Sequence, residues 1–500
     1  MKLFNYLFWT ILTLLFFLLY FLIDYEHLLI FISCLFIILS LYFSIVYTYN
    51  LLISLFGYVN IKRDYLIKND KTKFLIMVAA HNEELVIKQT ILNLKKINYD
   101  KELFDICIVS DNSTDHTTEI ALKENVKVVD TIQGKYKREG VGKPAGIQYA
   151  LREMGFNYIK KQYDMIMILD ADNFVSQNIL KEVNSQYIMR GKPTAIQVFL
   201  DSKNYSKFMS LAYTVVFWTN NRFMQLAKYR LGIPNSIGGT GFFIDANWII
   251  NNGGFKFDSL TEDLEMEIEI VKNGGRILWN DHASIYDEKP ESTRISMKQR
   301  YRWIKGHWYV AFKEILNLLK KFILTLNIKY LDKIFFLMSM GKAFQMFLVL
   351  IIFIVNIIII TQERGLAIFL NQLNLLSTAH IFNEYVFYFS NFNMFLIFYS
   401  FVFLPLYSVY TRIRKINPFS VVFSLFWFLT TELVIEFLGL FTWPNQSNWV
   451  KTPHTKIEIE TTNETFLHPE NYESKNSPVI DIKEINIDKN INSIKKSYKP

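Results

Sequence analysis

Long apolar runs constrain the fold of this chain more than any other feature of its sequence. Residues 3–23 and 28–56 are each long enough to cross a hydrocarbon core, because about 20 helical residues span roughly 30 Å. Further candidate spans lie near 333–361 and 388–411, and another apolar segment covers 418–443. We therefore expect membrane helices on both sides of a separate, more polar region.

Charged residues show that this polar region is large. The 500 residues are 51% hydrophobic, with 44 Phe and 28 Tyr, yet they include 54 Lys or Arg and 46 Asp or Glu. A helical bundle buried wholly in lipid could not accommodate so many charges. The two cysteines, Cys34 and Cys107, are too few for a disulfide framework or a zinc cluster.

The distribution of charge predicts the orientation in the membrane. Asp24 and Glu26 separate the first two apolar runs, whereas Lys62 and Arg63 follow the second. By the positive-inside rule, residues 62 onward lie in the cytoplasm of a multi-pass protein of the cell membrane. Loops that contact anionic lipid explain the net charge of +8. Nucleic acid is not an expected partner, because the sequence contains no recognisable nucleic-acid-binding module.

The region that begins at Lys73 alternates short apolar runs with amphipathic stretches. Segments 84–97 and 143–154 have a helical pattern, so together with the apolar runs they form βαβ units. This pattern predicts a doubly wound α/β domain, in which ligands bind beyond the carboxyl ends of the strands. The runs expected to be buried parallel strands are 74–80, 105–111, 126–130, 164–170 and 194–200.

Acidic residues follow several of these predicted strands. Asp170 and Asp172 lie at the end of run 164–170, where two carboxylates suit a hard divalent cation that bridges a diphosphate. Asp111 ends another run, and Asp263 precedes a segment with a helical pattern. Each of these acids, taken alone, is also compatible with a structural role: a helix cap or solvated turn for Asp170 and Asp172, and a helix cap for Asp111 and Asp263.

Five short motifs occur in order along this region: His81-Asn82-Glu83-Glu84, Asp111-Asn112-Ser113, Asp170-Ala171-Asp172, Thr261-Glu262-Asp263 and Gln299-x-x-Arg302-Trp303. Together they resemble the processive family 2 glycosyltransferases, which include cellulose, hyaluronan and poly-N-acetylglucosamine synthases. The resemblance covers about residues 74–310. The order of the five motifs is far more specific than any one of them.

The resemblance implies a GT-A fold with a doubly wound mixed sheet and a donor site at the strand ends. In that fold Asp111 contacts the nucleotide, with Glu83 and Lys143 nearby. Asp172, helped by Asp170, holds Mg²⁺ or Mn²⁺ on the diphosphate of the nucleotide sugar.

The resemblance also implies the roles of the two later motifs. Asp263 is the general base that removes the proton of the acceptor hydroxyl, and Glu262 stands beside it. Gln299, Arg302 and Trp303 form the acceptor end of the site, and Arg302 is also able to face the diphosphate. The alternative for Trp303 is an aromatic anchor on a helix at the membrane surface, because residues 294–323 are amphipathic and rich in Lys and Arg.

These roles amount to an inverting glycosyl transfer. A metal ion and an Arg neutralise the leaving diphosphate, while one carboxylate activates the acceptor and no second carboxylate serves as nucleophile. An α-linked UDP-sugar then gives a β-linked polysaccharide, which the chain's own helices help to export. The expected partners are a UDP-sugar donor, a growing polysaccharide or lipid-linked acceptor, and membrane lipid.

Two other functions are compatible with the sequence. A nonprocessive transferase that adds one sugar to a polyprenyl phosphate or a diacylglycerol shares the same carboxylates. The Gln299-x-x-Arg302-Trp303 motif and the C-terminal apolar segments favour the processive enzyme over it. A non-catalytic export subunit is the third function, and the intact acids Asp172 and Asp263 count against it.

The expected organisation has five parts. The segment 418–443 is predicted to be re-entrant or interfacial, because a full span would put Trp449-Val450-Lys451-Thr452-Pro453-His454 outside. That stretch resembles an element that lies near the site on the cytoplasmic side. The parts are two transmembrane helices (1–61), a cytoplasmic GT-A domain (62–293), acceptor-site and interfacial helices (294–325), a transmembrane or re-entrant region (326–456) and a flexible cytoplasmic tail (457–500).

Overall fold

A computed structural model describes most of the chain. The described residues are 25–59, 62–140, 142–339, 343, 346–347, 350, 388–412 and 416–446, with side chains omitted for 25–37 and 39. The predicted first span, most of 333–361, the stretch from Trp449 to His454 and the tail from 457 lie outside these residues. Two compact units are present: Met1–Leu51 with Lys342–Ser400, and Leu52–Gly341 with Phe401–Pro500.

Three helices in the described part of the chain are long and apolar enough to cross a membrane. They cover Ser40–Gly57, Tyr388–Tyr410 and Pro418–Thr442. The first lies largely within helix α2 (Tyr25–Ser54), where the second span was predicted. Within the first unit, the hydroxyl of Ser44 on α2 donates a hydrogen bond to the side chain of Asn393, so a buried polar pair joins two apolar segments.

The second unit is built on one eight-stranded mixed sheet in the order β3-β2-β1-β4-β7-β6-β8-β5. Strand β1 pairs in parallel with β2 and β4, and β2 pairs in parallel with β3. Strand β7 is antiparallel to both of its neighbours, which makes the sheet mixed. The strands are β1 Phe74–Ala80, β2 Phe104–Ser110, β3 Lys127–Asp130, β4 Met165–Asp170, β5 Phe174–Val175, β6 Ala195–Ser202, β7 Phe242–Asp245 and β8 Ile277–Asp287.

The five predicted strands are therefore present, and their continuous apolar character has a structural reason. Successive side chains of a strand point to opposite faces of a sheet. Ile76 and Val78 pack with helices on one face, and Leu75 and Met77 pack with helices on the other. A strand covered on both faces needs apolar residues at every position.

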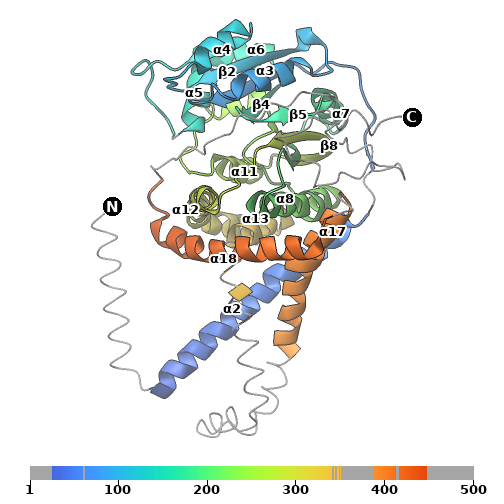
Figure 1. Ribbon diagram of the computed structural model, residues 1–500, viewed down its shortest axis with the longest axis vertical. Coiled ribbons are helices and arrows are strands. Elements are labelled where there is room, and N and C mark those ends of the chain that lie inside the picture. Colours follow the sequence, from blue (N-terminus) through green and yellow to red (C-terminus); the bar gives the residue numbers. More distant parts are fainter. Residues whose placement is uncertain are drawn as a thin grey trace. The chain divides into compact units, whose positions relative to one another are not determined.

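Helices cover both faces, which confirms the doubly wound α/β prediction (Figure 1). The helices packed on the first face are α3 Ile87–Lys95, α4 Thr117–Lys123 and α7 Ile179–Met189. The helices packed on the second face are α5 Lys143–Met154, α6 Phe156–Gln162, α10 Ala246–Asn251 and α11 Glu262–Lys272. Short 3₁₀ turns occur at Leu55–Gly57 and Lys101–Leu103.

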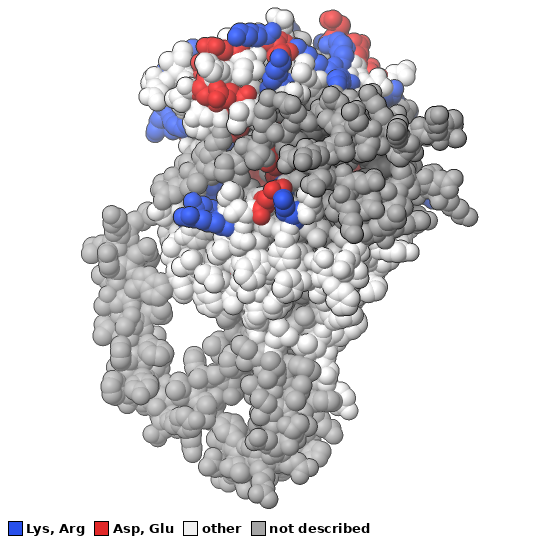
Figure 2. Space-filling view, in the orientation of Figure 1, with Lys and Arg blue, Asp and Glu red and all other residues white. Residues whose placement is uncertain are grey.

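A second group of helices lies on the side of this unit away from α3, α4 and α6 (Figure 1). Within it, α12 packs against α11, α13 and α18, and α8 packs against α17 and α18. Figure 2 shows charged side chains gathered over the α3, α4 and α6 end and few of them near α18. The helices are α8 Phe208–Asn220, α9 Ala227–Leu231, α12 Thr293–Thr325, α13 Ile328–Met338, α17 Leu404–Tyr410 and α18 Pro418–Thr442, with π-helical turns at Asn221–Leu226 and Tyr399–Phe403.

The first residues of the predicted span 333–361 belong to a helix of the second unit. Residues 333–338 belong to α13, whose Leu337 and Ile334 pack with α11 and α12. Lys333 is fully buried and forms an ion pair with Glu267 of α11 at 2.7 Å. Residues 333–338 therefore pack on α11 and α12 of the α/β unit instead of belonging to a membrane span.

Candidate active site

The carboxyl ends of β1, β2 and β4 meet at one edge of the sheet. Ala80 at the end of β1 lies opposite Ser110 at the end of β2, and Ala79 lies opposite Asp170 at the end of β4. The backbone N–H of Asp111 donates to the carbonyl of Ala80 at 2.8 Å. The acidic motifs that follow these strands are therefore brought together by the register of the sheet.

Asp111 is buried and its carboxylate is already hydrogen-bonded. Arg138 donates to both carboxylate oxygens, at 2.9 and 2.6 Å, and the hydroxyl of Thr131 donates to one of them at 3.1 Å. A Cβ on Gly146 of α5 would lie 3.0 Å from the Cβ of Asp111, so any larger residue there would require Asp111 to shift by a few tenths of an ångström. The sequence reasoning missed Arg138, whose only signal was its position in the loop before Lys143.

Glu83 lies close to the same edge. Its side chain is mostly buried, and its backbone N–H donates to the hydroxyl of Thr117 at 2.7 Å. A ring nitrogen of His81 lies 2.7 Å from the carbonyl oxygen of Asp111. The first two motifs therefore lie together. Helix α5 connects them to the third motif, because Gly146 lies against Asp111 and Lys143 forms an ion pair with Asp170.

Lys143, the first residue of α5, is the cation at the centre of the site. Its ammonium lies 2.7 Å from Asp170 and also donates to the carbonyl of Gly239. Burial lowers the pKa of Lys143, but the carboxylates of Asp170 and Glu262 outweigh this effect and raise that pKa overall. Lys143 is therefore held in its charged form.

Asp172 is buried two residues beyond Asp170, beside a carboxylate that the sequence reasoning missed. Its Oδ2 accepts from the backbone N–H of Glu288 at 3.2 Å. Asp287, at the end of β8, has a raised pKa because it is buried, while Lys289 lowers that pKa and the charges of Asp172 and Asp170 raise it further. No local pattern marked Asp287, because β8 was not predicted.

The side chains at this place offer ligand atoms that suit a hard divalent cation. Asp170 and Asp172 supply carboxylate oxygens, the ligands that Mg²⁺ and Mn²⁺ prefer. In the described part of the chain, no cluster of three His, Cys, Asp or Glu side chains has metal-binding geometry. A cation here would need further ligands from water and from a bound diphosphate, which is usual for Mg²⁺.

Glu262 and Asp263 lie in the first turn of α11, next to this group. Burial, and then the charge of Glu262, raise the pKa of Asp263 to about 7. Burial also raises the pKa of Glu262, against the opposing charges of Lys143 and Arg302. A Cβ on Gly239 would lie 3.2 Å from a carboxylate oxygen of Asp263, and Gly239 has a φ of 78°. A carboxyl with a pKa near neutrality can exchange a proton at working pH.

Helix α12 brings the last motif to the same place. Arg302 is close enough to Glu262 to lower its pKa. Trp303 is partly buried, with its ring 6.1 Å from that of Tyr213 on α8. The buried Oε1 atom of Gln299 has no hydrogen-bond partner among the described residues. Trp303 therefore packs inside the unit rather than only at its surface, and Gln299 has an acceptor available for a ligand.

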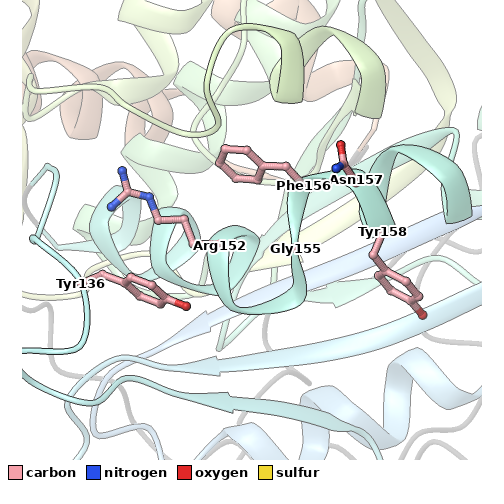
Figure 3. Close-up of a pocket in the computed structure, with 6 residues that line it drawn as sticks. All are labelled: Tyr136, Arg152, Gly155, Phe156, Asn157 and Tyr158. Carbon is pink, nitrogen blue, oxygen red and sulfur yellow. The ribbon is translucent and has the colours of Figure 1, made fainter.

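The described cavity lies elsewhere. An open depression of about 610 Å³ beside α5 and α6 is lined by Tyr136, Arg152, Gly155, Phe156, Asn157 and Tyr158. Figure 3 shows Arg152 on α5, Phe156, Asn157 and Tyr158 on α6, and Tyr136 beside them from the preceding loop. None of the lining residues belongs to the five motifs. Arg152 is already paired with Glu139 at 2.6 Å. This depression is not the centre of the predicted chemistry.

Known proteins resemble this domain. Residues 72–306 match the family described as Glycosyltransferase like family 2. A probable glycosyltransferase, YdaM of Bacillus subtilis strain 168, is 26% identical over 255 residues, which are 50% of this chain and 58% of that protein. The poly-β-1,6-N-acetyl-D-glucosamine synthase of Staphylococcus aureus strain COL is 23% identical over 244 residues, which are 49% of this chain and 57% of that protein.

A solved structure is also similar. The mannosyltransferase PcManGT of Pyrobaculum calidifontis, solved in complex with GDP-Man and Mn²⁺, is 12% identical, with a TM-score of 0.44. The likeness covers 82% of this chain and 98% of that chain.

The mixed α/β sheet with acids beyond its strand ends, together with the family match, defines a glycosyltransferase domain of the GT-A class. The chain carries a family 2 glycosyltransferase domain over residues 72–306. This match confirms the family 2 assignment predicted from the five motifs, and the processive subgroup stays a prediction.

Proposed function

We propose that this protein is a processive, inverting glycosyltransferase of the cell membrane. It would polymerise a sugar from a cytoplasmic UDP-sugar into a β-linked polysaccharide and help to move the product across the membrane. The observation that carries the proposal is the meeting of Asp263, with a pKa of about 7, and the cations Lys143 and Arg302 around the donor acids. The name of the staphylococcal relative, a polysaccharide synthase, supports the same function.

The donor end of the site would bind the UDP-sugar. Asp111 and Arg138 face the nucleotide, with Glu83 nearby. Asp172 and Asp170 would hold Mg²⁺ or Mn²⁺, which neutralises charge on the departing diphosphate. Lys143 and Arg302 add fixed positive charge beside the same leaving group, where preorganised charges lower the barrier most.

The acceptor end would supply the nucleophile. Asp263 takes the proton of the acceptor hydroxyl as that oxygen attacks the anomeric carbon. A single base on the acceptor side, without a carboxylate nucleophile, gives one displacement and hence inversion. The indole of Trp303 offers an apolar surface to the face of the acceptor sugar, while Gln299 accepts a hydrogen bond from one of its hydroxyls.

The apolar helices support a place in the membrane. One face of α18 is buried against the domain, through Val421, Leu425, Phe428 and Ile435. The opposite face exposes large apolar side chains, namely Phe419, Phe423, Trp427, Val434 and Phe437. Both faces of α18 are therefore apolar: one packs on the domain, and the other is free to contact lipid. We extend the proposal to an interfacial α18 that lies between the domain and the membrane.

Product analysis tests this function directly. Purified membranes that contain the protein would be incubated with a panel of UDP-sugars and Mn²⁺ or Mg²⁺, and the products separated by size and digested to determine linkage. A long β-linked polymer from one donor is the expected result. Transfer of a single sugar to lipid would show the nonprocessive enzyme instead. Failure to hydrolyse or transfer any donor would favour the non-catalytic export subunit.

A further inference from the structure

One side chain joins the end of α18 to the segment that carries the proposed base. Gln446 lies shortly after Thr442, the last residue of α18, and its Oε1 atom accepts from the backbone N–H of Leu260 at 2.8 Å. Leu260 directly precedes Thr261-Glu262-Asp263. The Nε2 atom of Gln446 donates to the carbonyl of Lys305 on α12 at 3.4 Å and to that of Trp443. A single amide therefore joins the end of α18 to two segments that are distant in the sequence.

Two glycines bring these segments into close backbone contact. A Cβ on Gly306 of α12 would lie 2.5 Å from the hydroxyl oxygen of Thr261 and 2.7 Å from its backbone nitrogen. A Cβ on Gly439 of α18 would lie 2.5 Å from the Cγ2 atom of Ile304 on α12. Helix α18 thus packs closely on α12, and α12 packs closely on the first residues of α11.

Arg300 holds α18 against α12 at a second point. Its guanidinium donates to the carbonyl of Phe428 at 2.8 Å and to the hydroxyl of Thr431 at 2.7 Å, and the residue is 2% exposed. These bonds are buried, so breaking them leaves polar groups without partners. The position of α18, and with it that of Gln446, is therefore well defined relative to α12.

We propose that Gln446 is a positioning residue for Asp263, so that the apolar helix α18 and the catalytic carboxylate keep a common geometry. The inference rests on the proposed function, in which Asp263 is the general base. A base acts only within hydrogen-bond reach of the proton it removes, and a displacement of about 1 Å can cost a hundredfold in rate. Leu260 is 4% exposed, so loss of Gln446 would leave its backbone N–H without this partner and favour local opening of the segment.

Three variants of Gln446 test separately the length of this side chain and its ability to form hydrogen bonds. Gln446→Leu removes the acceptor. Gln446→Asn keeps an amide but is one methylene too short, and it serves as the test if the leucine variant does not fold. Gln446→Glu keeps an acceptor for Leu260 at the same reach but cannot donate to the carbonyls of Lys305 and Trp443, so it tests the acceptor alone. Gln162→Leu makes the same chemical change on α6, away from the motifs, and is the matched control.

The expected result is a selective loss of turnover. Gln446→Leu and Gln446→Asn should lower kcat about tenfold, with the KM for donor changed less than twofold, because donor contacts lie elsewhere. Gln162→Leu should retain kcat within about twofold, and Gln446→Glu should lose less than Gln446→Leu because it keeps the bond to Leu260. Hydrogen exchange of the peptide that covers Leu260 should accelerate in the first two variants only.

The two readouts distinguish this inference from the proposed function. If the wild-type protein transfers no sugar, the proposed function fails, whereas hydrogen exchange still reports on the Gln446–Leu260 bond. If wild type is active and Gln446→Asn retains full kcat, Gln446 does not position the base. A fall in kcat without faster exchange at Leu260 would also overturn the inference, because the effect would not pass through this hydrogen bond.

Discussion

Helix α11 carries carboxylates into two different electrostatic surroundings. Glu267, in its middle, is buried and lies 2.7 Å from Lys333, and the neighbouring Lys228 lies 2.7 Å from Asp332. Two cations and two carboxylates therefore balance one another. Asp263, at the start of the helix, instead shares its surroundings with Glu262 and Lys143, and its pKa is raised to about 7.

The comparison shows how a carboxylate with a structural role, Glu267, differs from one with a proposed catalytic role, Asp263. Glu267 also accepts from the backbone N–H of Ile237 at 2.8 Å, so it fixes the loop that leads to Gly239. A fully paired buried group holds elements together and has little reason to bind a ligand. An incompletely balanced group with a perturbed pKa is the usual mark of a catalytic site.

The largest effect on activity is expected from Asp263→Asn. An amide cannot accept the acceptor proton, so polymer synthesis should fall by about a thousandfold while folding and donor binding are retained. The measurements are polymer yield and the Kd for the UDP-sugar. Asp258→Asn, at an exposed position just before α11, is the control. Polymer synthesis by Asp263→Asn at the wild-type level would remove Asp263 from the role of base.

The largest effect on stability is expected from Lys333→Met. Removing the cation leaves Glu267 charged and buried without its partner, which should cost about 3–5 kcal/mol. Thermal unfolding in detergent would measure the loss. Lys329→Met, at a partly exposed position on the same helix, should have little effect. An unchanged Tm for Lys333→Met would show that the buried ion pair between Lys333 and Glu267 does not stabilise the fold.

A smaller effect, on product length, is expected from Trp303→Ala. The contact between an indole and a sugar is worth about 1 kcal/mol, so occupancy by the chain end should fall several-fold at each addition. Sizing of the polymer should then show short oligosaccharides. Trp308→Ala removes an indole that stacks on Phe312 of the same helix and is the control. Polymer of normal length from Trp303→Ala would leave Trp303 as an anchor only.

The smallest effect is a shift in pH dependence. Asp263 is active as a base when deprotonated, so kcat/KM should rise with pH through about 7. The negative charge of Glu262 raises the pKa of Asp263, so Glu262→Gln should move this rise to lower pH and leave relatively more activity at acidic pH. Glu269→Gln, farther along α11, should leave the profile in place. A rise that moves to higher pH would contradict the assignment.

Local sequence determined much of the domain. The apolar runs 74–80 and 164–170 are strands β1 and β4 almost to the residue, because strands buried on both faces are apolar at every position. Short polar residues directly after such runs also lie at the strand ends by necessity. For this reason Asp111, Asp170 and Asp172 could be named as candidate site residues before the fold was known.

Residues that act through distant contacts could be found only from the tertiary structure. Arg138 is 27 residues from Asp111, and Gln446 is 186 residues from Leu260. Asp287 was hidden because β8 pairs with β6 and β5, and no local pattern reveals those partners. Hydropathy likewise placed Lys333 at the start of a membrane span, although it is neutralised by a carboxylate 66 residues earlier. Periodicity and motif order are properties of neighbouring residues, whereas pairing between elements depends on the folded geometry of the whole domain.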